Sequence, residues 1–151
     1  MKILLATDGT KCSDEAVNVL SRFSFSRDDS LKVISVIDMA LPVSIDIYGG
    51  FLPPNIELEK AVKENADKIL SETSERILSF LEISPNQIST EVLFGSPESR
   101  IVETAEEMKA DMIVVGSHGY NSWERLLLGS VSDSVVHHAP CSVLVVRKPK
   151  T

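Results

Sequence analysis

The chain has 151 residues, of which 43% are hydrophobic and 25% are charged, and its formal net charge is −7. This length predicts a single domain over residues 1–151, able to bury roughly 68–70% of its unfolded surface without a metal or disulfide. The negative charge argues against nucleic acid or an anionic membrane surface as the main partner. A phosphate ligand stays open, because backbone N–H groups bind anions without cationic side chains.

Three features of the sequence predict the cellular compartment. The N-terminus reads MKILLATDGT, and its apolar run before Asp8 is too short for a signal peptide. No segment reaches the roughly 18 apolar residues of a membrane span. The two cysteines, Cys12 and Cys141, lie far apart and fit no metal-binding or catalytic spacing. We therefore expect a cytoplasmic protein with reduced thiols and no membrane partner.

The first part of the chain predicts two buried strands. KILLATDG (2–9) is a short apolar run that ends in turn residues, and LKVISVID (31–38) is a second such run. Between them lies a helical pattern with Ser13 as its expected N-cap. Residues 39–54 have no clear period and contain three prolines and a Gly-Gly pair. So long a connection is either a plain connector or a lid or binding loop.

Helices and strands alternate through the rest of the chain. A helical period runs from Asn55 to about Ile83, and strand patterns follow at 87–95, 111–117 and 141–149. A helix with Ser96 as N-cap joins the first two of these strands. A short helix, GSVSDSVVHHAP (129–140), precedes the last strand, and the Ser130–Asp133 spacing predicts a capping box at its start.

This alternation predicts the fold class. We expect an α/β protein with one five-stranded, parallel, doubly wound sheet in the order 3-2-1-4-5 and helices on both faces, similar to a Rossmann fold. In such a sheet, ligands bind beyond the carboxyl ends of strands 1 and 4, where the strand order reverses. The loop after strand 1 is TDGTKCS (7–13), and the loop after strand 4 opens at Gly116.

The stretch GSHGYNSWERLLLGS (116–130) falls at this reversal point. Gly116 and Gly119 allow the backbone to turn and approach a ligand without a Cβ in the way. The pair Gly129 and Ser130 opens a helix, whose free N–H groups suit a phosphate. The alternative is purely structural: Gly116 ends a strand, Gly119 makes a turn, and Ser130 caps its own helix.

GSHGYNSWERLLLGSVS resembles the nucleotide-binding signature of the universal stress protein family, G-x2-G-x9-G-[ST], and matches it at Gly116, Gly119, Gly129 and Ser130. ILLATDGT, VISVID and PCSVLVVR resemble the first, second and last strands of the family. The resemblance runs nearly end to end and is weakest over 39–54. It implies the ATP-binding group of the family, since members that do not bind ATP lack the signature.

The resemblance also implies roles for individual positions. Asp8 matches the family's acidic residue near the ribose and the metal, and the backbone of Val36 matches the position that contacts adenine. Gly129, Ser130 and Val131 match the start of the phosphate-binding helix. The complete set of expected nucleotide-binding residues is Thr7, Asp8, Val36, Val115, Gly116, Ser117, His118, Gly119, Gly129, Ser130 and Val131. His118 is equally well explained as an exposed loop histidine, and Asp8 as a residue that caps its own turn.

The predicted function is binding rather than catalysis. No nucleophile–base pair is evident, and Asp8 is better suited to holding Mg²⁺ than to activating water. We therefore expect a stress-response or signalling module that binds ATP and Mg²⁺, with slow hydrolysis at most. The alternative is an ATP-hydrolysing or phosphotransfer enzyme similar to adenine nucleotide hydrolases, although TDGTKCS lacks the Ser-Gly-Gly loop expected there. A homodimer through the last strand, Ser142–Val146, would pair an otherwise exposed sheet edge.

Overall fold

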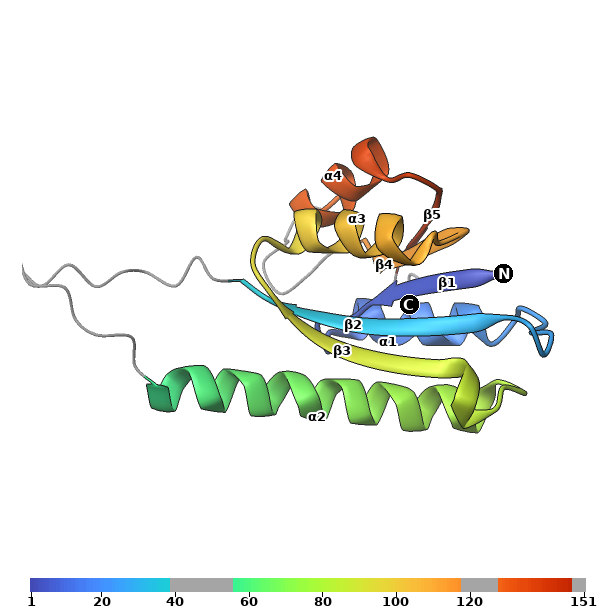
Figure 1. Ribbon diagram of the computed structural model, residues 1–151, viewed down its shortest axis with the longest axis horizontal. Helices are drawn as coiled ribbons and strands as arrows, with labels where there is room; N and C mark the ends of the chain where they lie inside the picture. Colours follow the sequence, from blue (N-terminus) through green and yellow to red (C-terminus); the bar gives the residue numbers. More distant parts are fainter. Residues whose placement is uncertain (39–55, 118–127, 148–151) are drawn as a thin grey trace, which may run out of the picture.

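The computed structural model describes residues 1–38, 56–117 and 128–147 (Figure 1). Its helices and strands alternate as the sequence predicts. In chain order they are β1 (Lys2–Ala6), α1 (Lys11–Leu20), β2 (Ser30–Ile37), α2 (Ile56–Phe80), a 3-10 turn η1 (Pro85–Gln87), β3 (Ile88–Phe94), α3 (Pro97–Met108), β4 (Met112–Gly116), α4 (Ser130–His138) and β5 (Ser142–Val146).

The five strands form one parallel sheet in the order β3-β2-β1-β4-β5, which confirms the predicted topology. The strand order reverses at β1, which pairs with β2 on one side and with β4 on the other. Ile3, for example, lies opposite Leu31 of β2 and Met112 of β4. The carboxyl ends of β1 and β4 are therefore neighbours at one edge of the sheet.

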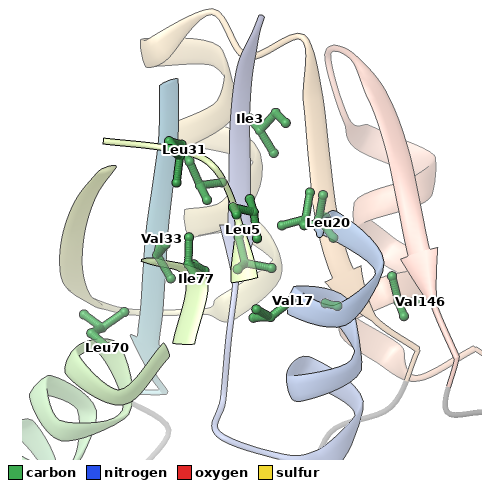
Figure 2. Close-up of a cluster of buried hydrophobic side chains, with 13 residues drawn as sticks. Ile3, Leu5, Val17, Leu20, Leu31, Val33, Leu70, Ile77 and Val146 are labelled. Carbon is green, nitrogen blue, oxygen red and sulfur yellow. The ribbon is translucent and has the colours of Figure 1, made fainter. Parts of the chain in front are cut away.

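Helices cover both faces of the sheet, with α1 and α2 on one side and α3 and α4 on the other (Figure 1). Successive strand residues point to opposite faces, so Ile3 and Leu5 of β1 pack toward α1 and α2 while Leu4 packs toward α3 and α4. Figure 2 shows the core on the α1 and α2 side, where side chains from both helices meet those of β1 and β2. Each face thus has its own buried apolar core.

The starts of two helices differ from the prediction. Helix α1 has Thr10 as its N-cap, and Thr10 accepts a hydrogen bond from the amide of Ser13, so the assignment of Ser13 as N-cap is wrong. Helix α4 has Gly129 as its N-cap and no capping hydrogen bond from a side chain, so the predicted capping box of Ser130 and Asp133 is also wrong. In both cases the helix begins earlier, because a preceding residue already has the extended backbone of a cap.

The long connection at 39–54 lies outside the described residues, and its role as a connector, lid or binding loop stays a prediction. Within residues 1–38, 56–117 and 128–147, no helix combines the length and the apolar character that crossing a membrane requires.

Candidate functional site

The carboxyl ends of β1 and β4 are held in place by hydrogen bonds to the neighbouring strands. The amide of Thr7, just after β1, donates to the carbonyl of Ile34 in β2 over 2.9 Å. The amide of Ser117, just after β4, donates to the carbonyl of Val146 in β5 over 2.8 Å. Thr7 and Ser117 are both buried. The two loops that leave this edge therefore start from rigid positions.

The loop after β1 is organised around the carboxylate of Asp8. Its Oδ1 atom accepts hydrogen bonds from the amide of Thr10 (3.0 Å), the hydroxyl of Thr10 (2.7 Å) and the hydroxyl of Ser13 (2.9 Å). Asp8 itself is half-buried. The turn and the first turn of α1 thus present a fixed carboxylate at the carboxyl edge of the sheet.

Gly9 makes this turn possible and also places it against α2. Its φ angle is +74°, a left-handed conformation that glycine adopts without strain. A Cβ built on Gly9 would lie 3.0 Å from both Cγ1 and Cδ1 of Ile69 in α2. The acidic turn is therefore packed directly on a helix that is distant in sequence.

Gly116 lies where β4 meets the start of α1. A Cβ at this position would lie 3.1 Å from Cβ of Cys12, and 3.2 Å from both the carbonyl carbon of Cys12 and the amide nitrogen of Ser13. We expected Gly116 to allow a ligand to approach the backbone. The structure shows that it also allows α1 to approach β4, so this glycine has a packing reason of its own.

The carbonyl oxygen of Ser117 attaches α4 to the end of β4. It accepts a hydrogen bond from the amide of Gly129 (2.8 Å) and lies 3.1 Å from the hydroxyl of Ser132. The same hydroxyl lies 2.9 Å from the carbonyl oxygen of Gly129. The first turn of α4 is thereby fixed to the strand that carries Gly116.

The first turn of α4 begins at this edge of the sheet without a side-chain cap. Its cap, Gly129, has φ −64° and ψ 154° and no side-chain hydrogen bond to the helix. Ser130 is exposed, whereas the side chain of Val131 packs against the core on the α3 and α4 side. The uncapped N–H groups and the helix dipole together favour an anion here.

The remaining predicted site residues are placed as follows. Val115 is buried in β4, and Val36 of β2 packs against the same core as Val131. The described contacts join Thr7 to β2, Gly116 to α1 and Ser117 to Gly129, so most of the expected residues share the carboxyl edge of the sheet. His118 and Gly119 lie outside the described residues.

Three residues of this site were missed by the sequence reasoning, namely Ser13 as a partner of Asp8, Ile69 as a contact of Gly9, and Ser132 as a contact of Ser117. A serine three residues after a cap position is a detectable signal for Ser13 and Ser132. No local pattern indicates the contact of Ile69, because it depends on how α2 packs.

Asp8 is the carboxylate that the loop after β1 could offer to a cation. In residues 1–38, 56–117 and 128–147, no three His, Cys, Asp or Glu side chains come together in a way that could hold a metal ion. Mg²⁺ commonly binds through one or two carboxylates and completes its coordination with phosphate oxygens and water. Asp8 fits that kind of site and does not fit a cage made entirely of protein ligands.

Comparison with known proteins identifies the family. The family model described as the universal stress protein family matches residues 1–147. The chain belongs to the universal stress protein family. A universal stress protein of Methanocaldococcus jannaschii is 37% identical to it over 150 residues, which cover 99% of this chain and 83% of the relative. The resemblance stated from the sequence is confirmed.

Solved structures show that this universal stress protein shares the family's fold. A solved structure described as the hypothetical protein MJ0577 superposes with a TM-score of 0.80 at 24% identity, covering 99% of this chain and 97% of the other. A universal stress protein in complex with cAMP has a TM-score of 0.67 at 23% identity (97% and 96% covered). A universal stress protein of Archaeoglobus fulgidus in complex with dAMP has a TM-score of 0.64 at 19% identity (97% and 97% covered).

Proposed function

We propose that this universal stress protein binds ATP together with Mg²⁺ at the carboxyl edge of its sheet and acts as a nucleotide-dependent stress-response or signalling module. The observation that carries the proposal is the uncapped first turn of α4, held to the end of β4 by the carbonyl of Ser117. Amides at Ser130 and Val131 are suited to the phosphates. The site residues predicted from the sequence, His118 and Gly119 included, are those we assign to the nucleotide.

Solved relatives support an adenine nucleotide as the ligand. One structure is described in complex with cAMP and another in complex with dAMP. These ligands share an adenine and a phosphate, which are the parts of ATP that Val36 and the start of α4 are expected to contact. The triphosphate and the metal go beyond those complexes and are the part of the proposal that most needs a test.

Asp8 is the residue we assign to Mg²⁺. Its Oδ1 atom is occupied by three hydrogen bonds from Thr10 and Ser13, whereas Oδ2 accepts none from the described residues. Bound there, Mg²⁺ would offset the negative charge of the phosphates close to the carboxylate. The chain's own part is to hold one carboxylate oxygen in a fixed position and to present amides to the anion.

Titration calorimetry tests the proposal, with ATP, ADP, AMP and cAMP added separately in the presence and absence of Mg²⁺. We expect ATP with Mg²⁺ to bind, and an absence of binding at about 1 mM nucleotide would contradict the proposal. The decisive variant is Ser130→Asp. A carboxylate in the first turn of a helix does not destabilise it, but it would repel a phosphate, so the ATP affinity should fall by at least about tenfold while the fold is retained.

The matched control is Ser99→Asp, which adds the same charge to the first turn of α3, following the edge strand β3. It should leave the ATP affinity nearly unchanged. Equal losses in both variants would show that net charge, and not the start of α4, governs binding. Sustained ATP turnover that is lost in Asp8→Ala would instead favour the alternative, an ATP-hydrolysing or phosphotransfer enzyme.

A homodimer and a cytoplasmic location complete the proposal. Strand β5 lies at an edge of the sheet, and its central residues Val143, Leu144 and Val145 are only partly buried. Pairing two copies of Ser142–Val146 across a two-fold axis would satisfy the open backbone edge. Sedimentation velocity should show a dimer at about 10 μM, and a monomer at that concentration would contradict this part.

A further inference from the structure

The carboxylate of Asp8 has an asymmetric set of partners. Oδ1 accepts three hydrogen bonds, from the amide and hydroxyl of Thr10 and from the hydroxyl of Ser13. A carboxylate offers about four acceptor sites over its two oxygens, so three donors saturate Oδ1. Oδ2 has no donor within the described part of the chain. One oxygen is committed to the protein, and the other is available to a ligand.

The hydroxyl of Ser13 has a single proton and three oxygen atoms within reach, of which the hydroxyl of Thr10 is the most distant at 3.4 Å. It lies 2.9 Å from Oδ1 of Asp8 and 2.8 Å from the carbonyl oxygen of Thr10. A hydrogen bond to a charged carboxylate is roughly twice as strong as one between neutral groups, so the proton goes to Asp8. Only 3% of Ser13 is exposed, which leaves little room for water to replace this hydroxyl.

Packing fixes the position of Ser13. Its amide nitrogen lies 3.2 Å from the point that a Cβ on Gly116 would occupy, so the first turn of α1 rests directly on the end of β4. Ser13 therefore has its backbone against the end of β4 while its hydroxyl donates to the carboxylate that follows β1. A donor in a fixed position opposes rotation of the Asp8 carboxylate about its Cβ–Cγ bond, and this rotation is the motion that would exchange Oδ1 and Oδ2.

We propose that Ser13 is a positioning residue for the metal of the nucleotide complex: it holds Oδ1 of Asp8 so that Oδ2 is presented to Mg²⁺. This role rests on the proposed function, because it requires a Mg²⁺–nucleotide ligand. Residues that orient a metal-binding carboxylate without touching the metal change metal affinity by about 10–100-fold when they are removed. The effect of Ser13 should therefore be visible only when Mg²⁺ is present.

The test compares ATP affinity in Mg²⁺ with ATP affinity in EDTA for four proteins. Ser13→Ala should bind ATP with Mg²⁺ about tenfold more weakly than the wild type and ATP in EDTA equally well. Ser13→Thr keeps a hydroxyl and should show the wild-type ratio of ATP affinity in Mg²⁺ to ATP affinity in EDTA. Ser74→Ala is the matched control, because it removes a half-buried hydroxyl that donates to the carbonyl of Leu70 in α2 (2.8 Å); it should change neither affinity.

The outcomes separate this role from the proposed function. A wild type that binds no nucleotide in either buffer overturns both. A wild type whose ATP affinity is the same with Mg²⁺ and with EDTA overturns the role of Ser13 and the Mg²⁺ part of the proposed function, and leaves nucleotide binding intact. The wild type could bind ATP more tightly with Mg²⁺ than with EDTA, and Ser13→Ala could show the same ratio of the two affinities. That result overturns the role of Ser13 alone. If Ser13→Ala does not fold, Thr10→Val removes another donor to Oδ1 and should show the same loss confined to Mg²⁺.

Discussion

The hydroxyl of Ser132 lies 3.1 Å from the carbonyl oxygen of Ser117, so the first turn of α4 is fixed to the end of β4 by a buried side chain as well as by the backbone. Both residues are almost fully buried. The contact connects the strand that ends at Gly116 with the helix that begins after Gly129. The relative position of these two segments determines whether their amides can serve one ligand.

Ser132→Ala should lower the free energy of unfolding by about 1 kcal/mol, the usual contribution of one buried hydrogen bond. Urea denaturation monitored by circular dichroism measures this change. The control is Ser134→Ala in the same helix, whose hydroxyl is less buried and lies 3.5 Å from Nδ1 of His138; it should have little effect. Equal effects of the two variants would contradict a special role for Ser132.

Gly116→Ala should destabilise the protein by about 1–3 kcal/mol through overpacking. The added methyl group would meet the Cβ and backbone of Cys12 and the amide of Ser13, at 3.1–3.2 Å. Because alanine keeps the Cβ of Cys12 and the other two contacts are with backbone atoms, shortening Cys12 to alanine should not restore stability. An unchanged urea midpoint for Gly116→Ala would show that α1 can move away from β4 at no cost.

Gly9→Ala should also be destabilising, for two separable reasons. A left-handed backbone costs a residue with a Cβ about 1–2 kcal/mol, and the new Cβ would lie 3.0 Å from atoms of Ile69. Adding Ile69→Ala should relieve the contact and leave the backbone cost, so the double variant should be more stable than additivity of the single changes predicts. Strict additivity of the unfolding free energies would mean that the turn does not rest on α2.

Asp29 should make the free energy of unfolding depend on pH in the acidic range. The amine of Met1 and the amide of Ser26 donate to its carboxylate and hold the pKa of Asp29 below its ordinary value. A pKa lowered in the folded state stabilises the protein above the unfolded value, and this stabilisation disappears as the pH falls through the folded value. In a protein with a free Met1 amine, Asp29→Asn should therefore flatten the acidic limb of the stability profile.

The contact between the amine of Met1 and Asp29 also predicts that stability depends on pH in the alkaline range. The hydrogen bond from the amine of Met1 to Asp29 raises the pKa of the amine. Stabilisation from a raised pKa is complete below the unfolded value and disappears as the pH rises through the folded value. Asp29→Asn should remove this dependence too. Stability profiles of wild type and variant that run parallel at both ends of the pH range would contradict the assignment.

The order of the elements and of the strands followed from the sequence because short apolar runs ending in glycine or aspartate alternate with helical periods. The topology then placed Asp8 and Gly116 at one edge without further information. The start of α1 was harder to predict, since Thr10 and Ser13 are both suitable caps. The backbone decides between them: Thr10 has the extended conformation of a cap, whereas Ser13 lies inside the helix.

Contacts between distant segments account for what the sequence did not predict. The packing of Ile69 on Gly9 depends on the position of α2 over the sheet, and the packing of Gly116 on Cys12 depends on how closely α1 approaches β4. Neither has a local signature. The sequence singled out Gly116 but not Gly9, and a one-dimensional pattern does not separate a glycine required by a ligand from one required by a neighbouring helix.

That ambiguity bears on how the glycine signature is used to sort relatives of this chain. A relative of this chain that does not bind nucleotides would still need glycine at the position of Gly116, because a side chain there would collide with its own first helix. Retention of glycine at 116 therefore reports on folding, and by itself it does not discriminate binders from non-binders.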